Sequence, residues 1–154
     1  MRKYLAPAAG AVLALASAAG AAAPTAPGDV KFDDLEISAS LTGQPGDPAK
    51  GREVFAGRSL GNCLACHANA DLSKELFHGE VGPELTDVAS RYEEGQLRAI
   101  VVNPKHVFGE ETVMPAFYRI INDQRVRKDL ADKPILTAEQ VEDLVAYLVT
   151  LKEQ

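Results

Sequence analysis

Two cysteines and a histidine lie together in the segment Cys63-Leu64-Ala65-Cys66-His67, which has the spacing C-x-x-C-H. Two thiols at this spacing can each add to a haem vinyl group, and the next residue then offers an imidazole nitrogen to the iron. The chain has 2 cysteines, so no thiol remains for another purpose. The pattern therefore predicts a covalently bound haem c attached to Cys63 and Cys66, with His67 as the proximal iron ligand.

Other uses of a C-x-x-C pair fit the chain less well. A redox dithiol of the thioredoxin type requires a βαβ context, whereas the segments on both sides of this pair look helical. A structural zinc site needs four ligands, and the remaining histidines, His78 and His106, are not paired at zinc-finger spacing. A disulfide between two incidental cysteines is the last alternative. An export signal and a well-placed methionine weaken it.

Residues 1–23 have the features of a secretory signal peptide. Arg2 and Lys3 precede an apolar, alanine-rich run, and small residues follow at 19–23. This order predicts cleavage near the end of the segment and export to the periplasm. An uncleaved membrane anchor is the alternative, although the run is short for a span and lacks bulky side chains. No later run is long enough to cross a membrane.

The rest of the chain divides into two parts. Residues 24–46 are interrupted by proline and glycine, and we expect an N-terminal arm that lies extended on the domain or on a partner, with disorder as the alternative. Residues 47–154 are long enough for one domain. The net charge of the chain is −6, and it becomes −8 when Arg2 and Lys3 leave with the signal peptide. This charge argues against a nucleic-acid-binding protein, which needs a basic face.

Helix signals recur within 47–154 and predict an all-α domain. Asp47 followed by Pro48 predicts a helix start, and this helix would run to about residue 56. A second helix is predicted over 93–102, where Asn103-Pro104 would end it and lead into a loop. Thr137 and Gln140 form a capping box for a last helix. That helix has an apolar stripe, with Glu142 expected in solvent; the stripe comprises Val141, Leu144, Val145, Leu148 and Leu151.

Glycine and aromatic residues predict how the first and last helices meet. Gly51 costs helix stability unless another segment approaches closely, and Tyr147 is the residue we expect to fill that space. Phe55, on the first helix, is expected in the core.

Met114 is the candidate for the second iron ligand. It is the only methionine besides the initiator, and it lies 47 residues after His67, in a loop and directly before Pro115. Proline stiffens such a loop and can direct the thioether at the open face of the iron. Paired histidine and methionine ligation is a recognised option for c-type haem. His106 is the main competitor, His78 is a weaker one, and an ordinary core methionine is the remaining interpretation.

Three further segments bear on the site. The loop Gly82-Pro83-Glu84-Leu85 offers a carbonyl that could accept a hydrogen bond from the second nitrogen of His67 and so fix the ring. Tyr92 and Arg98 could reach the edge of the haem. Residues 118–136 are locally basic, and they form either a solvated face or a docking surface.

The order of these motifs resembles that of class I cytochromes c. The matching positions are Gly51 and Phe55, Cys63-Cys66-His67, Gly82-Pro83-Glu84-Leu85, Met114-Pro115, and Leu144 with Tyr147. A closer similarity is to SoxX, the small haem subunit of the thiosulfate-oxidising SoxAX complex. It is carried by Ser40-Leu41-Thr42-Gly43, Pro45-Gly46-Asp47-Pro48, Gly61-Asn62-Cys63-Leu64-Ala65-Cys66-His67, Asn103-Pro104, Val113-Met114-Pro115-Ala116-Phe117-Tyr118 and Ile135-Leu136-Thr137.

The resemblance implies a class I cytochrome c-like fold around one haem c, with Cys63 and Cys66 attaching the haem and His67 and Met114 ligating the iron. It implies the electron-accepting subunit of a heterodimeric L-cysteine S-thiosulfotransferase. The catalytic cysteine would lie on a dihaem or monohaem SoxA-type subunit, the substrate cysteine on a SoxYZ-type carrier, and no catalytic residue on this chain. Another periplasmic cytochrome would receive the electrons. The alternative is a free-standing periplasmic electron carrier, because a fold does not determine a function.

Overall fold

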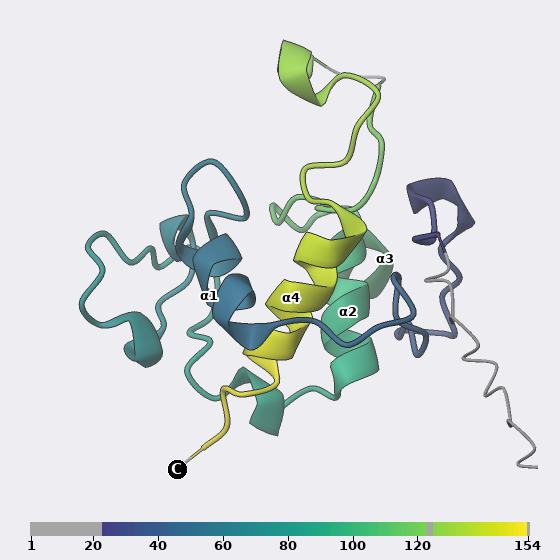
Figure 1. Cartoon of the computed structure of the whole chain (residues 1–154). Helices are drawn as coiled ribbons and strands as arrows, with labels where there is room; N and C mark the ends of the chain where they lie inside the picture. The colour runs from purple at the N-terminus through teal and green to yellow at the C-terminus, as the bar shows by residue number, and fades with distance from the viewer. Residues whose placement is uncertain (1–22, 123–124, 154) are drawn as a thin grey trace, which may run out of the picture.

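The computed structural model describes residues 23–122 and 125–153, and within these ranges it contains four α-helices. They are α1 (Pro48–Ala56), α2 (Glu94–Val102), α3 (Pro104–Phe108) and α4 (Ala138–Leu148), joined by long loops with single turns of 3-10 helix (Figure 1). The all-α prediction is confirmed, since the one strand-like pairing in these ranges is an isolated bridge between Asp33 and Glu36. The predicted signal peptide lies outside the described residues, apart from residue 23.

The helices α1, α2 and α4 begin within one residue of the predicted positions. The Asp47 side chain accepts hydrogen bonds from the main-chain N–H groups of Ala49 and Lys50, at 2.9 and 3.4 Å. Before α4, Thr137 and Gln140 exchange the two bonds of a capping box, at 2.9 and 3.2 Å. The helix α3 was not predicted, because Asn103-Pro104 indicated a loop. Proline is tolerated in the first turn of a helix, so the same residue that ends α2 begins α3.

The contact between α1 and α4 forms the centre of the core. A Cβ atom at Gly51 would lie 1.9 Å from the carbonyl oxygen of Asp143 and 2.7 Å from Cβ of Tyr147, so only glycine allows this approach. Phe55 is fully buried and meets the ring of Tyr147 edge-on, with 5.6 Å between centroids. The predicted role of Gly51 and the predicted core position of Phe55 are confirmed. The predicted apolar stripe is buried throughout, although its last member, Leu151, lies after the end of α4.

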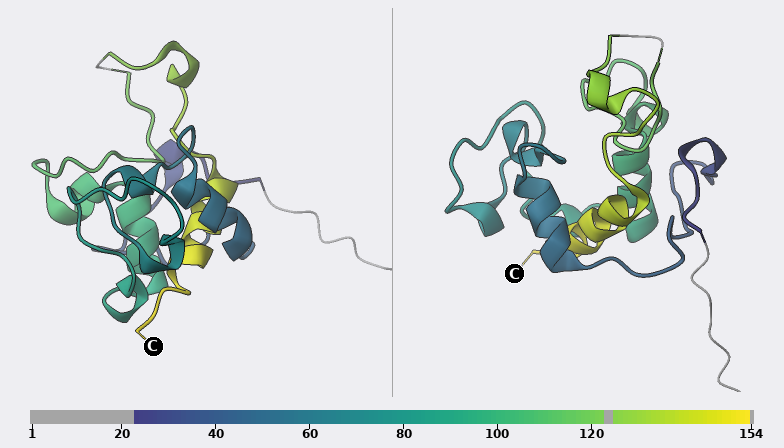
Figure 2. Two further views of the ribbon diagram at one scale, coloured as in Figure 1. Left: turned by 90° about the vertical axis from the view of Figure 1, so that its left-hand side faces the viewer. Right: turned by 45° about the horizontal axis from the view of Figure 1, so that its top comes forward.

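The N-terminal arm is ordered and lies along the helical domain. The N–H of Ile37 donates to the carbonyl oxygen of Gly95 at 3.0 Å, and the hydroxyl of Tyr118 donates to the main-chain carbonyl oxygen of Thr25 at 2.8 Å. Ile37 and Leu41 are buried in the core. Figures 1 and 2 show the arm running past α4 to the side of the molecule formed by α2 and α3. Of the expected alternatives, the structure therefore shows the arm on its own domain.

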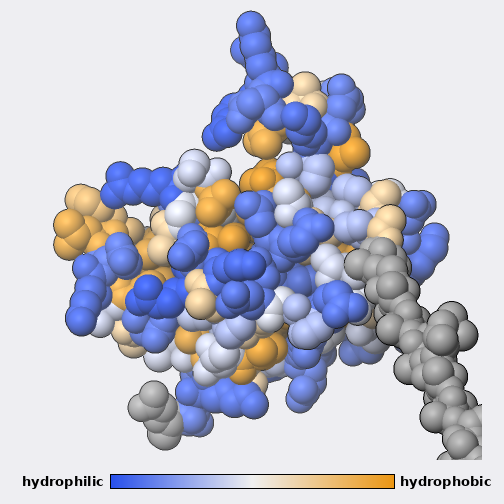
Figure 3. Space-filling model, viewed as in Figure 1, coloured by the Kyte–Doolittle hydropathy of each residue, from blue (hydrophilic) through white to orange (hydrophobic). Residues whose placement is uncertain are grey.

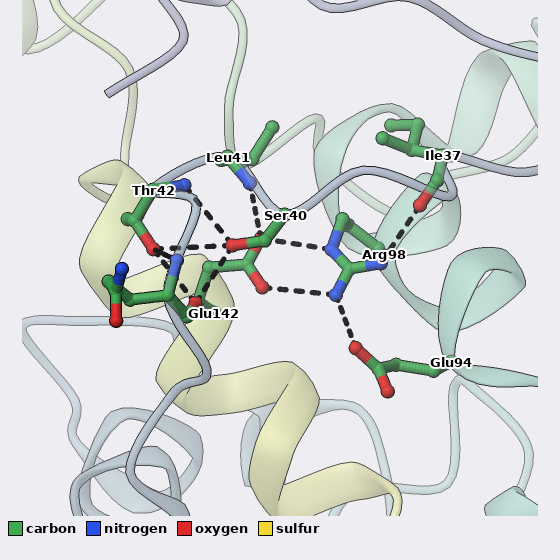
Figure 4. A network of polar contacts seen from close by, with 8 residues as sticks. Ile37, Ser40, Leu41, Thr42, Glu94, Arg98 and Glu142 are labelled. Carbon is green, nitrogen blue, oxygen red and sulfur yellow. Dashed lines mark hydrogen bonds and ion pairs between the residues drawn. The ribbon is translucent and has the colours of Figure 1, made fainter. Parts of the chain in front are cut away.

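A buried ion pair fastens the arm (Figure 4). Arg98 on α2 donates to both carboxylate oxygens of Glu142 on α4, at 2.9 and 3.0 Å. Arg98 also donates to the carbonyl oxygen of Ile37 at 2.9 Å, and Glu142 accepts from the N–H of Leu41 at 2.9 Å. The expectation that Glu142 stays in solvent is wrong, because the arm covers that side of α4. Arg98 is directed to this pair instead of to a haem edge.

After Tyr118 the chain leaves the body and returns at Leu136, whose N–H donates to the carbonyl oxygen of Phe117 at 3.0 Å. The excursion includes one 3-10 turn, Lys128–Leu130, and projects from the rest of the molecule (Figures 1 and 2). Its surface is mostly hydrophilic in Figure 3. Arg127 is paired with Asp129 at 2.6 Å, so the basic character of this segment is partly neutralised. Nowhere in the described ranges does a helix combine the length and apolarity that crossing a membrane would require.

Candidate haem site

A cavity of about 540 Å³ opens between the C-x-x-C-H segment, α2, α4 and the loop before Ala116. Its walls are mainly apolar, and the residues that form them include Phe55, Leu97, Ile100, Val101, Leu144 and Leu148. The remaining wall includes Cys63, Cys66 and His67 of the motif, together with the polar residues Asn62, Arg91, Tyr92 and Thr112. All three residues of the motif therefore border one apolar space.

A tight turn brings the motif to this wall. Cys63 begins a single turn of 3-10 helix, Cys63–Ala65, and Asn62 before it has a left-handed backbone with φ of 50°. The N–H groups of Cys66 and His67 both donate to the carbonyl oxygen of Cys63, at 3.1 and 2.9 Å. The turn holds both cysteines and the histidine on the same side of the cavity.

The orientation of His67 is fixed by main-chain atoms. Its Nδ1 lies 2.7 Å from the carbonyl oxygen of Pro83. A carbonyl oxygen can only accept, so Nδ1 carries the proton and Nε2 keeps the lone pair that a metal requires. The expected carbonyl acceptor is confirmed. The residue before Pro83 also approaches the ring: a Cβ atom at Gly82 would lie 2.2 Å from Cε1, so this glycine is needed for the imidazole to fit.

The surroundings of the two cysteines favour neither rival use of the motif. Desolvation by the surrounding protein raises the pKa of the Cys63 thiol to about 12, and the neighbouring Cys66 adds to the rise. A thioredoxin-type dithiol requires a βαβ unit, and the described residues contain helices and one isolated bridge. In the same ranges no group of three or more histidine, cysteine or acidic side chains is arranged to hold a metal ion. The thioredoxin-type and zinc interpretations therefore lose support.

Met114 is half-buried and borders the same cavity as His67. Among the described residues of the cavity wall, His67 is the only histidine. His106 is used elsewhere: its Nε2 donates to the carbonyl oxygen of Asp34 at 2.8 Å, and its ring lies 4.1 Å from that of Phe32.

The other competing histidine is also engaged outside the cavity. Nε2 of His78 donates to the carbonyl oxygen of Leu72 at 3.1 Å, and its Nδ1 accepts from the N–H of Asn69 at 3.3 Å. Both ring nitrogens therefore have protein partners. Of the residues named as candidates for the second ligand, the structure brings only Met114 to the cavity that holds His67.

Tyr92, a candidate for the haem edge, does border the cavity, and sequence reasoning missed a charged residue there, Arg91. The guanidinium of Arg91 donates to the carbonyl oxygen of Glu84 at 2.6 Å and pairs with Asp87 at 3.2 Å. The i, i+4 spacing of Asp87 and Arg91 was the available signal, but it indicates an ordinary surface pair as readily. An apolar cavity bordered by two thiols, an imidazole, a thioether and a cation fits a covalently attached haem with its iron and carboxylates.

Comparisons with known proteins agree with this fit. Residues 48–152 match the family model of cytochrome c. A search of curated proteins found no match. Among solved structures, SoxXA from P. pantotrophus is similar at 42% identity and a TM-score of 0.79, over 85% of this chain and 100% of that chain. The c-type cytochrome SorU from Sinorhizobium meliloti has 30% identity over 68% of this chain and 90% of that chain, with a TM-score of 0.45. The chain therefore belongs to the cytochrome c family, carries covalently attached haem c, and within that family is a SoxX-type protein.

Proposed function

We propose that this chain is the haem c electron-transfer subunit of a periplasmic SoxAX-type complex. The observation that carries the proposal is the similarity to SoxXA at 42% identity. This similarity covers 85% of the chain, a larger share than residues 48–152 make up, so it extends beyond the cytochrome c domain. A free-standing periplasmic electron carrier remains the alternative function.

In the proposed site, Cys63 and Cys66 attach the haem, and His67 and Met114 ligate its iron. The bound haem supplies a reversible one-electron acceptor. The carbonyl oxygen of Pro83 keeps the proton on Nδ1 of His67, which leaves Nε2 for the metal. The apolar walls exclude water from the haem faces, and Arg91 provides a positive charge at the cavity wall.

The proposed complex divides the chemistry between subunits. A SoxA-type subunit holds the catalytic cysteine, and thiosulfate is joined oxidatively to a cysteine of a SoxYZ-type carrier with release of two electrons. This chain receives those electrons singly and passes them to another periplasmic cytochrome. Its 2 cysteines are both assigned to haem attachment, which agrees with a catalytic thiol on the partner. The proposal includes a signal peptide at 1–23, an arm at 24–46 and a cytochrome c domain at 47–154.

The test combines the purified holoprotein with a SoxA-type subunit, a SoxYZ-type carrier, thiosulfate and an oxidised cytochrome. We expect no thiosulfate consumption by this chain alone, a stable heterodimer with the SoxA-type subunit, and consumption once the carrier and acceptor are added. Thiosulfate turnover by the isolated chain would contradict the proposal. Failure to bind the SoxA-type subunit of the same organism, with normal electron exchange, would instead support a free electron carrier.

A further inference from the structure

The loop that leads to Met114 is tied to α3 by one lysine. Nζ of Lys105, on α3, donates to the carbonyl oxygen of Glu110 at 3.1 Å and to that of Thr112 at 2.8 Å. These two acceptors lie on either side of residue 111, so the ammonium group spans the loop 109–113. The hydroxyl oxygen of Thr112 in turn lies 3.4 Å from the N–H of Met114. Thr112 therefore links the ammonium group of Lys105 to the main chain of Met114.

The helix that carries Lys105 is held on its other side. Pro104 is buried in the core. The imidazole of His106 donates to the carbonyl oxygen of Asp34 and packs against Phe32, so the N-terminal arm fastens α3. Lys105 thus connects a fixed helix to a loop that packs little against the rest of the protein: Val113, which borders the cavity, has 81% of its surface exposed.

The acceptors of Lys105 indicate that it fixes the path of the loop. An exposed lysine usually contributes to solubility or to a weak surface ion pair. Lys105 is half-buried, and within the described residues it forms no ion pair with a carboxylate. Both of its acceptors are main-chain carbonyls, so the contact constrains the backbone of the loop. Hydrogen bonds from charged donors are also stronger than those between neutral groups.

We propose that Lys105 is a positioning residue for Met114: its two hydrogen bonds to the loop 109–113 hold the thioether at the iron. The inference rests on the proposed ligation of the iron by Met114. Loss of the ammonium group frees the loop, and the fraction of molecules with the thioether off the iron rises. Loss of charge-assisted hydrogen bonds of this kind predicts a rise of about tenfold.

The experiment uses the ferric holoprotein with Lys105→Met, which keeps much of the side-chain length and removes the charge. The first measurement follows, during heating, the weak long-wavelength absorption of ferric iron bound to a thioether, together with the far-ultraviolet circular dichroism. The second is the rate at which added imidazole binds the iron, because imidazole enters only when the thioether has left. We expect the absorption to disappear well before the helices unfold, and imidazole to bind about tenfold faster.

Two matched variants serve as controls. Lys74 is exposed and forms no hydrogen bond or ion pair within the part of the chain that the structure describes, so Lys74→Met should behave as wild type. Lys105→Arg keeps a donor that can reach both carbonyls, and it should recover most of the wild-type behaviour. If Lys105 only stabilises the fold, Lys105→Met should lower the temperatures at which the absorption and the circular dichroism are lost by the same amount. Imidazole should then bind at the wild-type rate.

The outcomes separate this inference from the ligand assignment. If wild type shows the thioether absorption, Met114→Ala removes it, and Lys105→Met changes neither its thermal loss nor imidazole binding, the inference is wrong and the assignment stands. If wild type and Met114→Ala have the same spectrum, Met114 is not the ligand and both proposals fail. Selective early loss of the absorption in Lys105→Met, with recovery in Lys105→Arg, supports the inference.

Discussion

The side chain of His67 is positioned by two neighbours that provide main chain alone. The carbonyl oxygen of Pro83 accepts a hydrogen bond from Nδ1–H, and Gly82 leaves room for the ring. A proline cannot donate a hydrogen bond, and a glycine has no side chain, so both residue types suit a site where the backbone must approach an imidazole.

Replacing Gly82 by alanine tests this close approach. The new Cβ atom would lie 2.2 Å from Cε1 and 2.6 Å from Nδ1 of His67, so the ring must move and its bond to Pro83 is strained. We expect less covalently attached haem per polypeptide and a loss of about 1–3 kcal/mol in the free energy of unfolding. Haem that survives extraction by acidified organic solvent measures the first effect. Gly28→Ala is the control, because a Cβ atom there has no neighbour within 4 Å; equal haem retention in both variants would contradict the argument.

The choice of Met114 over His106 predicts different spectra for two alanine variants. Met114→Ala should remove the long-wavelength ferric absorption and lower the reduction potential, because a thioether ligand favours ferrous iron. His106→Ala should keep the absorption at room temperature, since His106 contacts the arm and does not border the cavity. Optical spectra and potentiometric titration give both results. The reverse pattern would identify His106 as the ligand.

At the level of secondary-structure elements, the pair Arg98–Glu142 connects α2, α4 and the arm. Both side chains are nearly inaccessible to solvent, with 2% and 3% of their surfaces exposed. Such a pair contributes little net stability compared with apolar residues of the same size, but removal of one partner leaves a buried charge uncompensated. The main-chain groups of Ile37 and Leu41 also depend on it.

Arg98→Met should therefore reduce the free energy of unfolding by about 3–5 kcal/mol. Arg127→Met removes a pair of similar length, 2.6 Å to Asp129, but both of its side chains are about two-thirds exposed, so we expect a far smaller loss than for Arg98→Met. The double variant Arg98→Met with Glu142→Leu should recover part of the loss, because it leaves no unpaired charge. Denaturant-induced unfolding of the holoproteins measures all three. Equal losses for Arg98→Met and Arg127→Met would show that burial of the pair is unimportant.

Features of the fold that depend on residues close together in the sequence could be predicted. The helix starts at residues 48 and 138 follow from capping residues within three positions of each start. The burial of Glu142 could not be predicted, because it is caused by Leu41, 101 positions away. The helix α3 was missed since proline is compatible with both a loop and a first helical turn. Lys105 carried no signal, because its acceptors are carbonyl groups that every residue has.

At the scale of the whole molecule, the arm and the haem cavity lie on a shared framework. The arm contacts α2 through Gly95 and Arg98, α3 through His106, and α4 through Glu142. The helices α2 and α4 also provide walls of the cavity. This arrangement makes the arm part of the folded domain, so its removal should affect the isolated chain before any partner is present.

Variants at two arm residues can distinguish a role of the arm in folding from a role in partner binding. Ile37 is 3% exposed and packs in the core, whereas Leu35, two residues earlier, is 44% exposed. Ile37→Ala should cost about 2–5 kcal/mol of stability in the isolated holoprotein, and deletion of residues 24–46 should cost more, because Arg98 and Glu142 also lose their main-chain partners. Leu35→Ala should change the free energy of unfolding by less than about 0.5 kcal/mol.

Thermal unfolding of the isolated holoproteins checks these effects, and binding to the SoxA-type subunit is then measured below the unfolding range. If the outer face of the arm also contacts that subunit, Leu35→Ala weakens binding at unchanged stability. If the deletion leaves the isolated chain as stable as wild type, the arm does not hold the domain together and serves the partner alone.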